Sequence, residues 1–66
     1  MTIPNYTKVE IVTDKFEPLG VPRGSYGFVI EVYDDGEYEV EVSDPERGGI
    51  TIALFSANDT EIRPAE

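Results

Sequence analysis

The chain has 66 residues, with 14 acidic and 5 basic side chains, a net charge of −9, and neither cysteine nor histidine. This length suits one small domain over residues 1–66, and the composition is globular rather than disordered. The missing residue types exclude disulfides, thiolate metal sites and histidine-based catalysis, and the negative charge disfavours binding to nucleic-acid phosphates.

The two ends carry no targeting or anchoring signal. Residues 1–7 are expected to form a short N-terminal extension and residues 64–66 a tail. No basic segment precedes an apolar stretch, and no apolar run approaches the roughly 20 residues that span a membrane. We therefore expect a cytoplasmic protein with no membrane partner.

Alternating apolar residues predict strands rather than helices along the whole chain. The prediction has five strands, at residues 8–12, 27–33, 37–42, 50–55 and 61–63. A long first loop, rich in proline and glycine, separates the first two strands. Residues 56–60 are long enough only for a single 3-10 turn before the last strand.

The turn between the second and third strands is predicted to contain three residues, Asp34, Asp35 and Gly36. A type I turn followed by a left-handed glycine fits this sequence. The resulting register would place three apolar pairs on one face of the sheet: Val32 with Tyr38, Ile30 with Val40, and Phe28 with Val42.

The remaining strands are expected to extend that inner face. The fourth strand would contribute Ile50, Ile52 and Leu54, and the first and last strands would contribute Val9, Ile11 and Ile62. A core this thin fits a small sheet that bends until it closes on itself. We therefore predict an all-β fold, a five-stranded SH3-like barrel with a long first loop.

Several short segments resemble a known family. They are Gly24-x-x-Gly27-x-Val29-x-Glu31-Val32-Tyr33, Glu37 to Val42, Ile52-Ala53-Leu54, Asp59 and Ile62-Arg63-Pro64. Over residues 8–64 the chain resembles the bacterial domain-of-unknown-function family 4926. The resemblance implies a small SH3-like protein without catalytic activity and, by analogy with other small acidic proteins, an immunity protein or antitoxin.

The acidic segment is the strongest functional signal, because eight acids and no base lie between residues 31 and 46. One interpretation is a solvated face that keeps the protein soluble. The other is a docking surface for a basic protein, such as a toxin encoded nearby, with aromatic anchors inside a charged rim. The predicted partner-binding residues are Glu31, Tyr33, Asp34, Asp35, Glu37, Glu39, Glu41 and Phe55.

The anchors depend on which side chains point outward. Val29, Tyr33, Ala53 and Phe55 would do so if their neighbours face the core. Alternatively, the long first loop folds over Val29 and Phe55, or these side chains fill a second layer of the barrel.

Other functions fit the sequence less well. The Asp34-Asp35-Gly36 segment lacks the spacing of a calcium loop, so no metal or cofactor is expected. Enzymatic activity is not expected, because no histidine activates a serine and so short a chain offers little pocket. The five scattered bases disfavour RNA. An SH3-like peptide-binding module, or an accessory subunit of a larger complex, remains the alternative.

Overall fold

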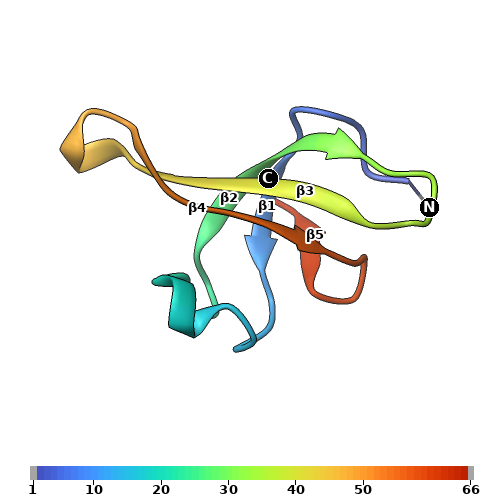
Figure 1. Cartoon of the computed structure of the whole chain (residues 1–66), viewed down its shortest axis with the longest axis horizontal. Helices are drawn as coiled ribbons and strands as arrows, with labels where there is room; N and C mark the ends of the chain where they lie inside the picture. Colours follow the sequence, from blue (N-terminus) through green and yellow to red (C-terminus); the bar gives the residue numbers. More distant parts are fainter. Residues whose placement is uncertain (1, 66) are drawn as a thin grey trace.

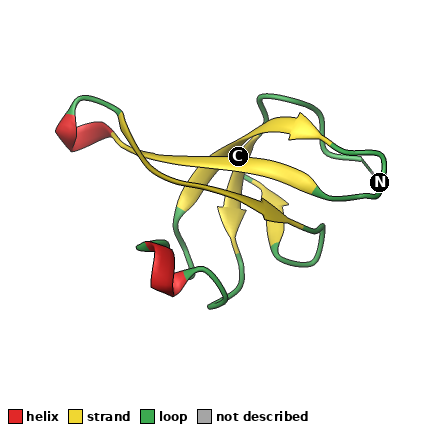
Figure 2. Cartoon of the chain, viewed as in Figure 1, coloured by secondary structure: helices red, strands yellow, loops and turns green. Residues whose placement is uncertain are grey.

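The computed structural model describes residues 2–65, which form one antiparallel sheet (Figure 1, Figure 2). Its strands are β1 (Lys8–Ile11), β2 (Tyr26–Val32), β3 (Tyr38–Asp44), β4 (Ile50–Ala57) and β5 (Ile62–Pro64). They lie in the order β4-β3-β2-β1-β5. The all-β class and the five strands are thus confirmed.

The sheet does not close into a barrel, so this part of the prediction is wrong. β5 has three residues and pairs only with β1, while β4 pairs only with β3. Because no ladder joins β4 to β5 within the described residues, these two strands form the edges of an open sheet. The hairpin of β3 and β4 projects beyond the other strands (Figure 1).

The predicted 3-10 turn before the last strand is also wrong. Two such turns exist elsewhere, η1 (Glu17–Leu19) in the first loop and η2 (Pro45–Arg47) between β3 and β4. Each has a proline in its first two positions, which presets the backbone angle, and each ends at a left-handed glycine. Residues 56 and 57 instead complete β4, and only a hydrogen-bonded turn precedes β5.

The three-residue turn between β2 and β3 is confirmed. Gly36 has a left-handed φ of 87°, and its N–H donates to the Tyr33 carbonyl at 3.2 Å. The Tyr33 N–H donates to the Glu37 carbonyl at 2.9 Å, which closes the loop over residues 34–36. Val32 therefore lies opposite Tyr38, as predicted.

Beyond this turn, a bulge between Val29 and Glu31 shifts the register. Val29 lies opposite Val40 and is fully buried, whereas Phe28 lies opposite Glu41 and is exposed. The predicted pairs of Ile30 with Val40 and of Phe28 with Val42 are therefore wrong. Since β2 carries apolar side chains on both faces, the extra residue alone decides which of them enter the core.

The predicted inner face of β4 is also wrong, because this strand, like β2, carries apolar residues on both faces. Val40 lies opposite Phe55 and Tyr38 opposite Ala57, so Phe55 and Ala57 turn toward the core, with Ala53 partly buried beside them. The side chains that were expected inside, those of Ile50, Ile52 and Leu54, are exposed. Apolar residues occupy both faces of this strand, so alternation does not distinguish the two registers.

The core lies between the sheet and the first loop. Val9, Ile11 and Ile62 are buried in it, as predicted. Phe16 comes from the first loop and stacks on Phe55, with ring centroids 4.0 Å apart. This loop covers the inner side of the sheet, and side chains such as Phe28, Glu31 and Leu54 are exposed on the opposite side of β2, β3 and β4.

The N-terminal segment packs along β2. Ile3 is buried, and its N–H donates to the hydroxyl oxygen of Tyr38 at 3.0 Å. The Val29 N–H donates to the Thr7 carbonyl at 3.0 Å. The Ile3 N–H thus gives the Tyr38 hydroxyl a hydrogen-bond partner, which a buried polar group needs because water cannot reach it.

Candidate binding face

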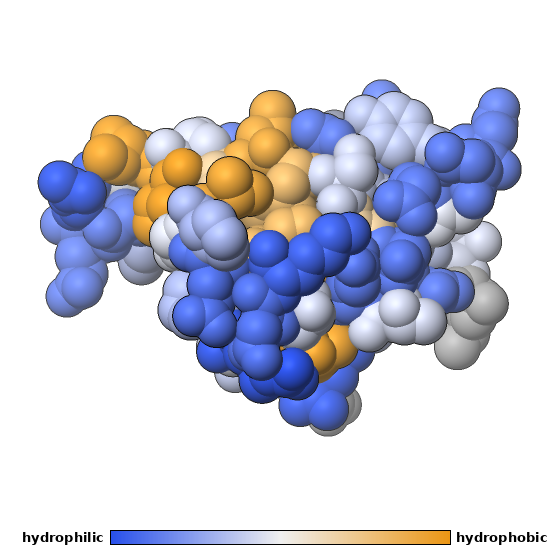
Figure 3. Space-filling model, turned by 60° about the horizontal axis from the view of Figure 1, so that its bottom comes forward, coloured by the Kyte–Doolittle hydropathy of each residue, from blue (hydrophilic) through white to orange (hydrophobic). Residues whose placement is uncertain are grey.

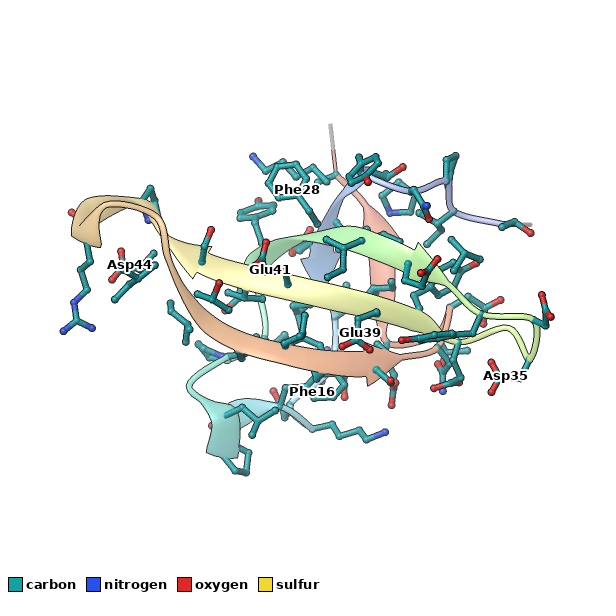
Figure 4. All side chains as sticks on the ribbon, turned by 45° about the horizontal axis from the view of Figure 1, so that its top comes forward. Phe16, Phe28, Asp35, Glu39, Glu41 and Asp44 are labelled. Atoms are coloured by element: carbon teal, nitrogen blue, oxygen red, sulfur yellow. The ribbon has the colours of Figure 1, made fainter. Side chains whose placement is uncertain are left out.

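The outer face is the side of β2, β3 and β4 that turns away from Phe16, and two rows of side chains cross it. Residues directly opposite in a ladder share a face, so Phe28, Glu41 and Leu54 form one row. Glu31, Glu39 and Ser56 form the next row, nearer the β2–β3 turn. Figure 4 shows Glu39 and Glu41 along β3, with Asp35 at the turn.

The predicted carboxylates are brought together at one end of this face. Glu31 lies opposite Glu39, as the predicted three-residue turn over residues 34–36 requires, and Asp34, Asp35 and Glu37 occupy the adjoining turn. Like charges placed directly opposite each other destabilise a strand pair by a few tenths of a kcal/mol. The sheet therefore carries a small electrostatic cost here, and a cationic partner would remove it.

The protein's own cations lie elsewhere. Four ion pairs join Lys15 to Glu61, Arg23 to Asp14, Arg47 to Asp44, and Arg63 to Glu10. The fifth base, Lys8, places its ammonium 4.8 Å from the Tyr26 ring centre. Within residues 2–65, none of the six carboxylates predicted as partner-binding forms an ion pair.

Hydroxyl groups orient the two central carboxylates. Glu39 accepts hydrogen bonds from the Tyr33 hydroxyl at 3.2 Å and from the Ser56 hydroxyl at 3.3 Å. The Thr51 hydroxyl donates to Glu41 at 2.9 Å. These neutral donors hold the carboxylates in place while leaving their charge uncompensated.

The pKa of Tyr33 is raised above its ordinary value at this end of the face. Partial removal from water raises it first, followed by the hydrogen bond to Glu39 and the charges of Glu39, Glu31 and Asp35. All these effects disfavour the phenolate. Tyr33 is 42% exposed beside the carboxylates, so it keeps the position expected of an anchor.

Phe55 does not belong to this site, and its assignment as an anchor is wrong. Its side chain is 7% exposed and stacks on Phe16 inside the core. The alternative interpretation, in which the first loop folds over Val29 and Phe55, describes Phe55 correctly, and Val29 is also buried. Figure 4 shows Phe16 and Phe28 on different sides of the sheet.

Other apolar side chains are exposed near the carboxylates, and the sequence pattern had predicted them to lie in the core. Phe28 is 46% and Leu54 54% exposed, and Ile50 and Ile52 are similarly open. Figure 3, which brings the first-loop side forward, shows a hydrophobic area beside the hydrophilic tip of the β3–β4 hairpin, and Ile52 lies near Gly20 on that side. The one available signal was that β4 holds two interleaved apolar sets, only one of which can be buried.

A shallow groove of about 610 Å³ adjoins this apolar area. Tyr26, Phe28 and Ile52 line it, together with Ser25 and Lys8. Its wall therefore combines two aromatic rings with a few polar groups, which is the usual make-up of a ligand groove.

Neither a metal-binding cluster nor a membrane-spanning helix occurs in the part of the chain that the structure describes. Across residues 2–65, no three acidic side chains are arranged to hold a metal ion. In the same part of the chain, no helix is both long and apolar enough to cross a membrane.

Comparison with known proteins places this geometry in a family. The family model described as a domain of unknown function (DUF4926) matches residues 6–64, which include all five strands and both rows of the outer face. Searches of curated proteins and of solved structures gave no significant match.

Proposed function

We propose that this chain, which belongs to the DUF4926 family, is a non-enzymatic protein-binding module whose outer face accepts a basic protein. The row formed by Phe28, Glu41 and Leu54 carries the proposal, because two half-exposed apolar side chains flank a carboxylate. Exposed apolar area beside charged groups is typical of protein interfaces. The apolar side chains would supply contact area and the carboxylates would select the partner.

Electrostatics supports a cationic partner. The net charge is −9, and the acidic end of the outer face has no internal counter-ion within residues 2–65. Such a field steers an oppositely charged protein during encounter, and salt weakens it over a Debye length of about 8 Å at physiological ionic strength. Association should therefore slow as salt is added.

In its most specific form, the proposal is that the chain is an immunity protein or antitoxin and that its partner is a basic toxin encoded nearby. A small acidic protein with an exposed apolar row can cover a cationic active site by charge and shape together. This form predicts one partner of fixed stoichiometry rather than many weak ones.

The test is capture from native cell lysate at low and high salt, with identification of the retained proteins. The double variant Glu39→Lys/Glu41→Lys replaces one carboxylate in each row with a positive charge. Glu17→Lys/Asp59→Lys is its control, because it makes the same charge change at exposed positions outside the two rows. We expect the first variant to lose the partner and the control to keep it.

Two outcomes would overturn the proposal. One is equal retention of the basic protein by both double variants, which would place the contact elsewhere. The other is retention that does not change between low and high salt, which would remove the electrostatic component. A partner gene beside this one would support the immunity form, and a distant one would contradict it.

A second candidate function rests on the groove beside Tyr26 and Phe28. In SH3 modules, an aromatic-lined groove binds proline-rich peptides. These peptides already adopt an extended polyproline helix before they bind. In that case a proline-rich peptide array would give specific binders, and Tyr26→Ala would abolish their binding while Glu39→Lys/Glu41→Lys would not.

A further inference from the structure

The proposed function uses the outer face of the sheet and assigns no role to the free edge of β4. β4 pairs with β3 on one side, and within residues 2–65 no backbone hydrogen bond is made on its other side. The strand is eight residues long and contains neither a charge nor a proline. An edge of this kind presents a row of backbone donors and acceptors to any extended chain that reaches it.

Most natural edges are protected against such pairing, and β4 has little protection. Charged side chains, prolines, bulges and short length are the usual devices. Here a single bulge opposite Val42 and Ser43 disturbs one end of the strand. Ile52 is the extra residue of this bulge, and the ladder is regular from Ala53 to Ala57, with Leu54 about half exposed beside it.

The two rows of the outer face indicate what kind of strand would fit. Ser56 is small and stands between Glu39 and the free edge. Adjacent strands lie about 5 Å apart, so a residue paired with Ser56 would be about 10 Å from Glu39 along the row. The side chains of lysine and arginine span this distance when a glutamate reaches toward them. In the next row, Leu54 would contact an apolar residue.

A second copy of this chain fits less well. Pairing β4 with β4 would join two molecules of charge −9 and set the carboxylate rows of both on one continuous sheet. Repulsion between the copies opposes that arrangement, whereas a cationic strand is attracted to the same edge. Charge therefore favours a basic partner strand.

We propose that the free edge of β4 binds an extended segment of a basic protein as an additional strand of the sheet. This segment has a lysine or arginine opposite Ser56 and an apolar residue opposite Leu54, two positions away. Backbone hydrogen bonds provide affinity and the alternating side chains provide selectivity. The inference rests on the proposed function and specifies how its partner docks.

The test uses a capped octapeptide, Lys-Thr-Val-Thr-Lys-Thr-Val-Thr, as the lysine–valine probe, added to the isotope-labelled protein; its lysine and valine side chains alternate along one face of an extended strand. In its control, the lysine–proline peptide, proline replaces each threonine, which keeps the charge but removes donors that a ladder needs. We expect the lysine–valine peptide to slow hydrogen exchange at about half of the β4 amides by tenfold or more. The lysine–proline peptide should leave these amides unchanged.

Two matched variants locate the contact. Leu54→Lys puts a positive charge on the free edge, and Tyr6→Lys makes the same exchange of an exposed apolar side chain for lysine in the N-terminal segment. We expect Leu54→Lys to weaken peptide binding about tenfold and Tyr6→Lys to change it less than about twofold. Thermal unfolding of both variants establishes that each is folded.

The remaining outcomes separate this inference from the proposed function. If the peptide perturbs residues 33–37 while β4 stays unprotected, the acidic turn binds cations without strand addition, and only the inference fails. Protection of β4 that depends on protein concentration without peptide would identify a second copy as the occupant and overturn it. Failure of the peptide to bind, while lysate capture retains a basic protein, would also overturn it. Failure of both experiments would remove the proposed function as well.

Discussion

The two edges of the sheet differ in how they are protected. At β5 the strand is only three residues long, ends in Pro64, and carries Arg63, whose guanidinium lies 2.8 Å from a Glu10 carboxylate oxygen. At β4 the strand is eight residues long and uncharged. Short length, charge and proline all block further pairing at the first edge, and the second has none of them. This difference indicates that β4, and not β5, is the edge available to a partner.

Both edges are nevertheless fixed to the core by a buried side chain. Phe55 holds β4 against Phe16, and Ile62 holds β5 at 2% exposure. An edge can therefore be firmly attached on its inner face and still be open along its backbone.

The largest effect is expected at the anchor of β4. Phe55→Ala removes the ring that stacks on Phe16 and should lower the free energy of unfolding by about 3–5 kcal/mol. Leu54→Ala, one residue away on the outer face, should change it by less than about 0.5 kcal/mol. Urea denaturation measures both. Similar losses in the two variants would contradict the assignment of the inner and outer faces of β4.

The corresponding change at β5 should be somewhat smaller. Ile62→Ala empties a buried site and should cost about 2–5 kcal/mol. Arg63→Ala removes an exposed ion pair and should cost no more than about 1 kcal/mol. If chemical denaturation gave Arg63→Ala the larger loss, charge rather than burial would hold this edge.

An intermediate effect is expected between the edges, where β2 and β3 approach closely. A Cβ atom on Gly27 would lie 2.7 Å from the Glu41 carbonyl oxygen, closer than real contacts allow. Gly27→Ala should therefore force the strands apart and cost about 1–3 kcal/mol in denaturation experiments. An unchanged stability would mean that the middle of the sheet adjusts as freely as its edges.

The smallest effect concerns the turn that leads into β5. Partial burial raises the pKa of Glu61. Hydrogen bonds from the Asn58 N–H and from Lys15, together with the charge of Lys15, lower it by more, so the net shift is downward. Ionised Glu61 then adds stability that is present above its unfolded pKa and is lost as the pH falls through its folded pKa.

Replacing this carboxylate tests the sign of that shift. Glu61→Gln should be less stable than the natural chain by about 1 kcal/mol near neutral pH. The two proteins should become equal in strong acid, where Glu61 is protonated. Thermal unfolding across the acid range measures the difference. A gap that persists at the lowest pH would show that Glu61 acts through packing instead of charge.

Local signals in the sequence predicted the parts of the fold that depend on few residues. Asp34, Asp35 and Gly36 specify their turn by themselves, because only glycine adopts the left-handed position readily. The pairing of Glu31 with Glu39 followed from this turn and is confirmed. The acidic end of the candidate site was therefore predictable from the sequence.

The apolar part of the site was not predictable, because it depends on where the strands bulge. One extra residue near Val29 moves Phe28 to the surface, and the pairing of Val40 with Phe55 turns Leu54 outward. β2 and β4 each carry apolar side chains on both faces, so either register gives a plausible core. The closed barrel failed for a related reason, since strand number alone does not specify whether the edges meet.

The pairing of β1 with β5 has a consequence for the order of folding. It joins residues far apart in the chain, for Glu10 and Arg63 are separated by 53 positions. The hairpins of β2, β3 and β4 need only short loops, so their closure costs less entropy. We expect pulsed hydrogen exchange to show these hairpins protected first and β5 last. Until β5 docks, β1 is itself an open edge, and the folding chain has an unprotected strand on each side.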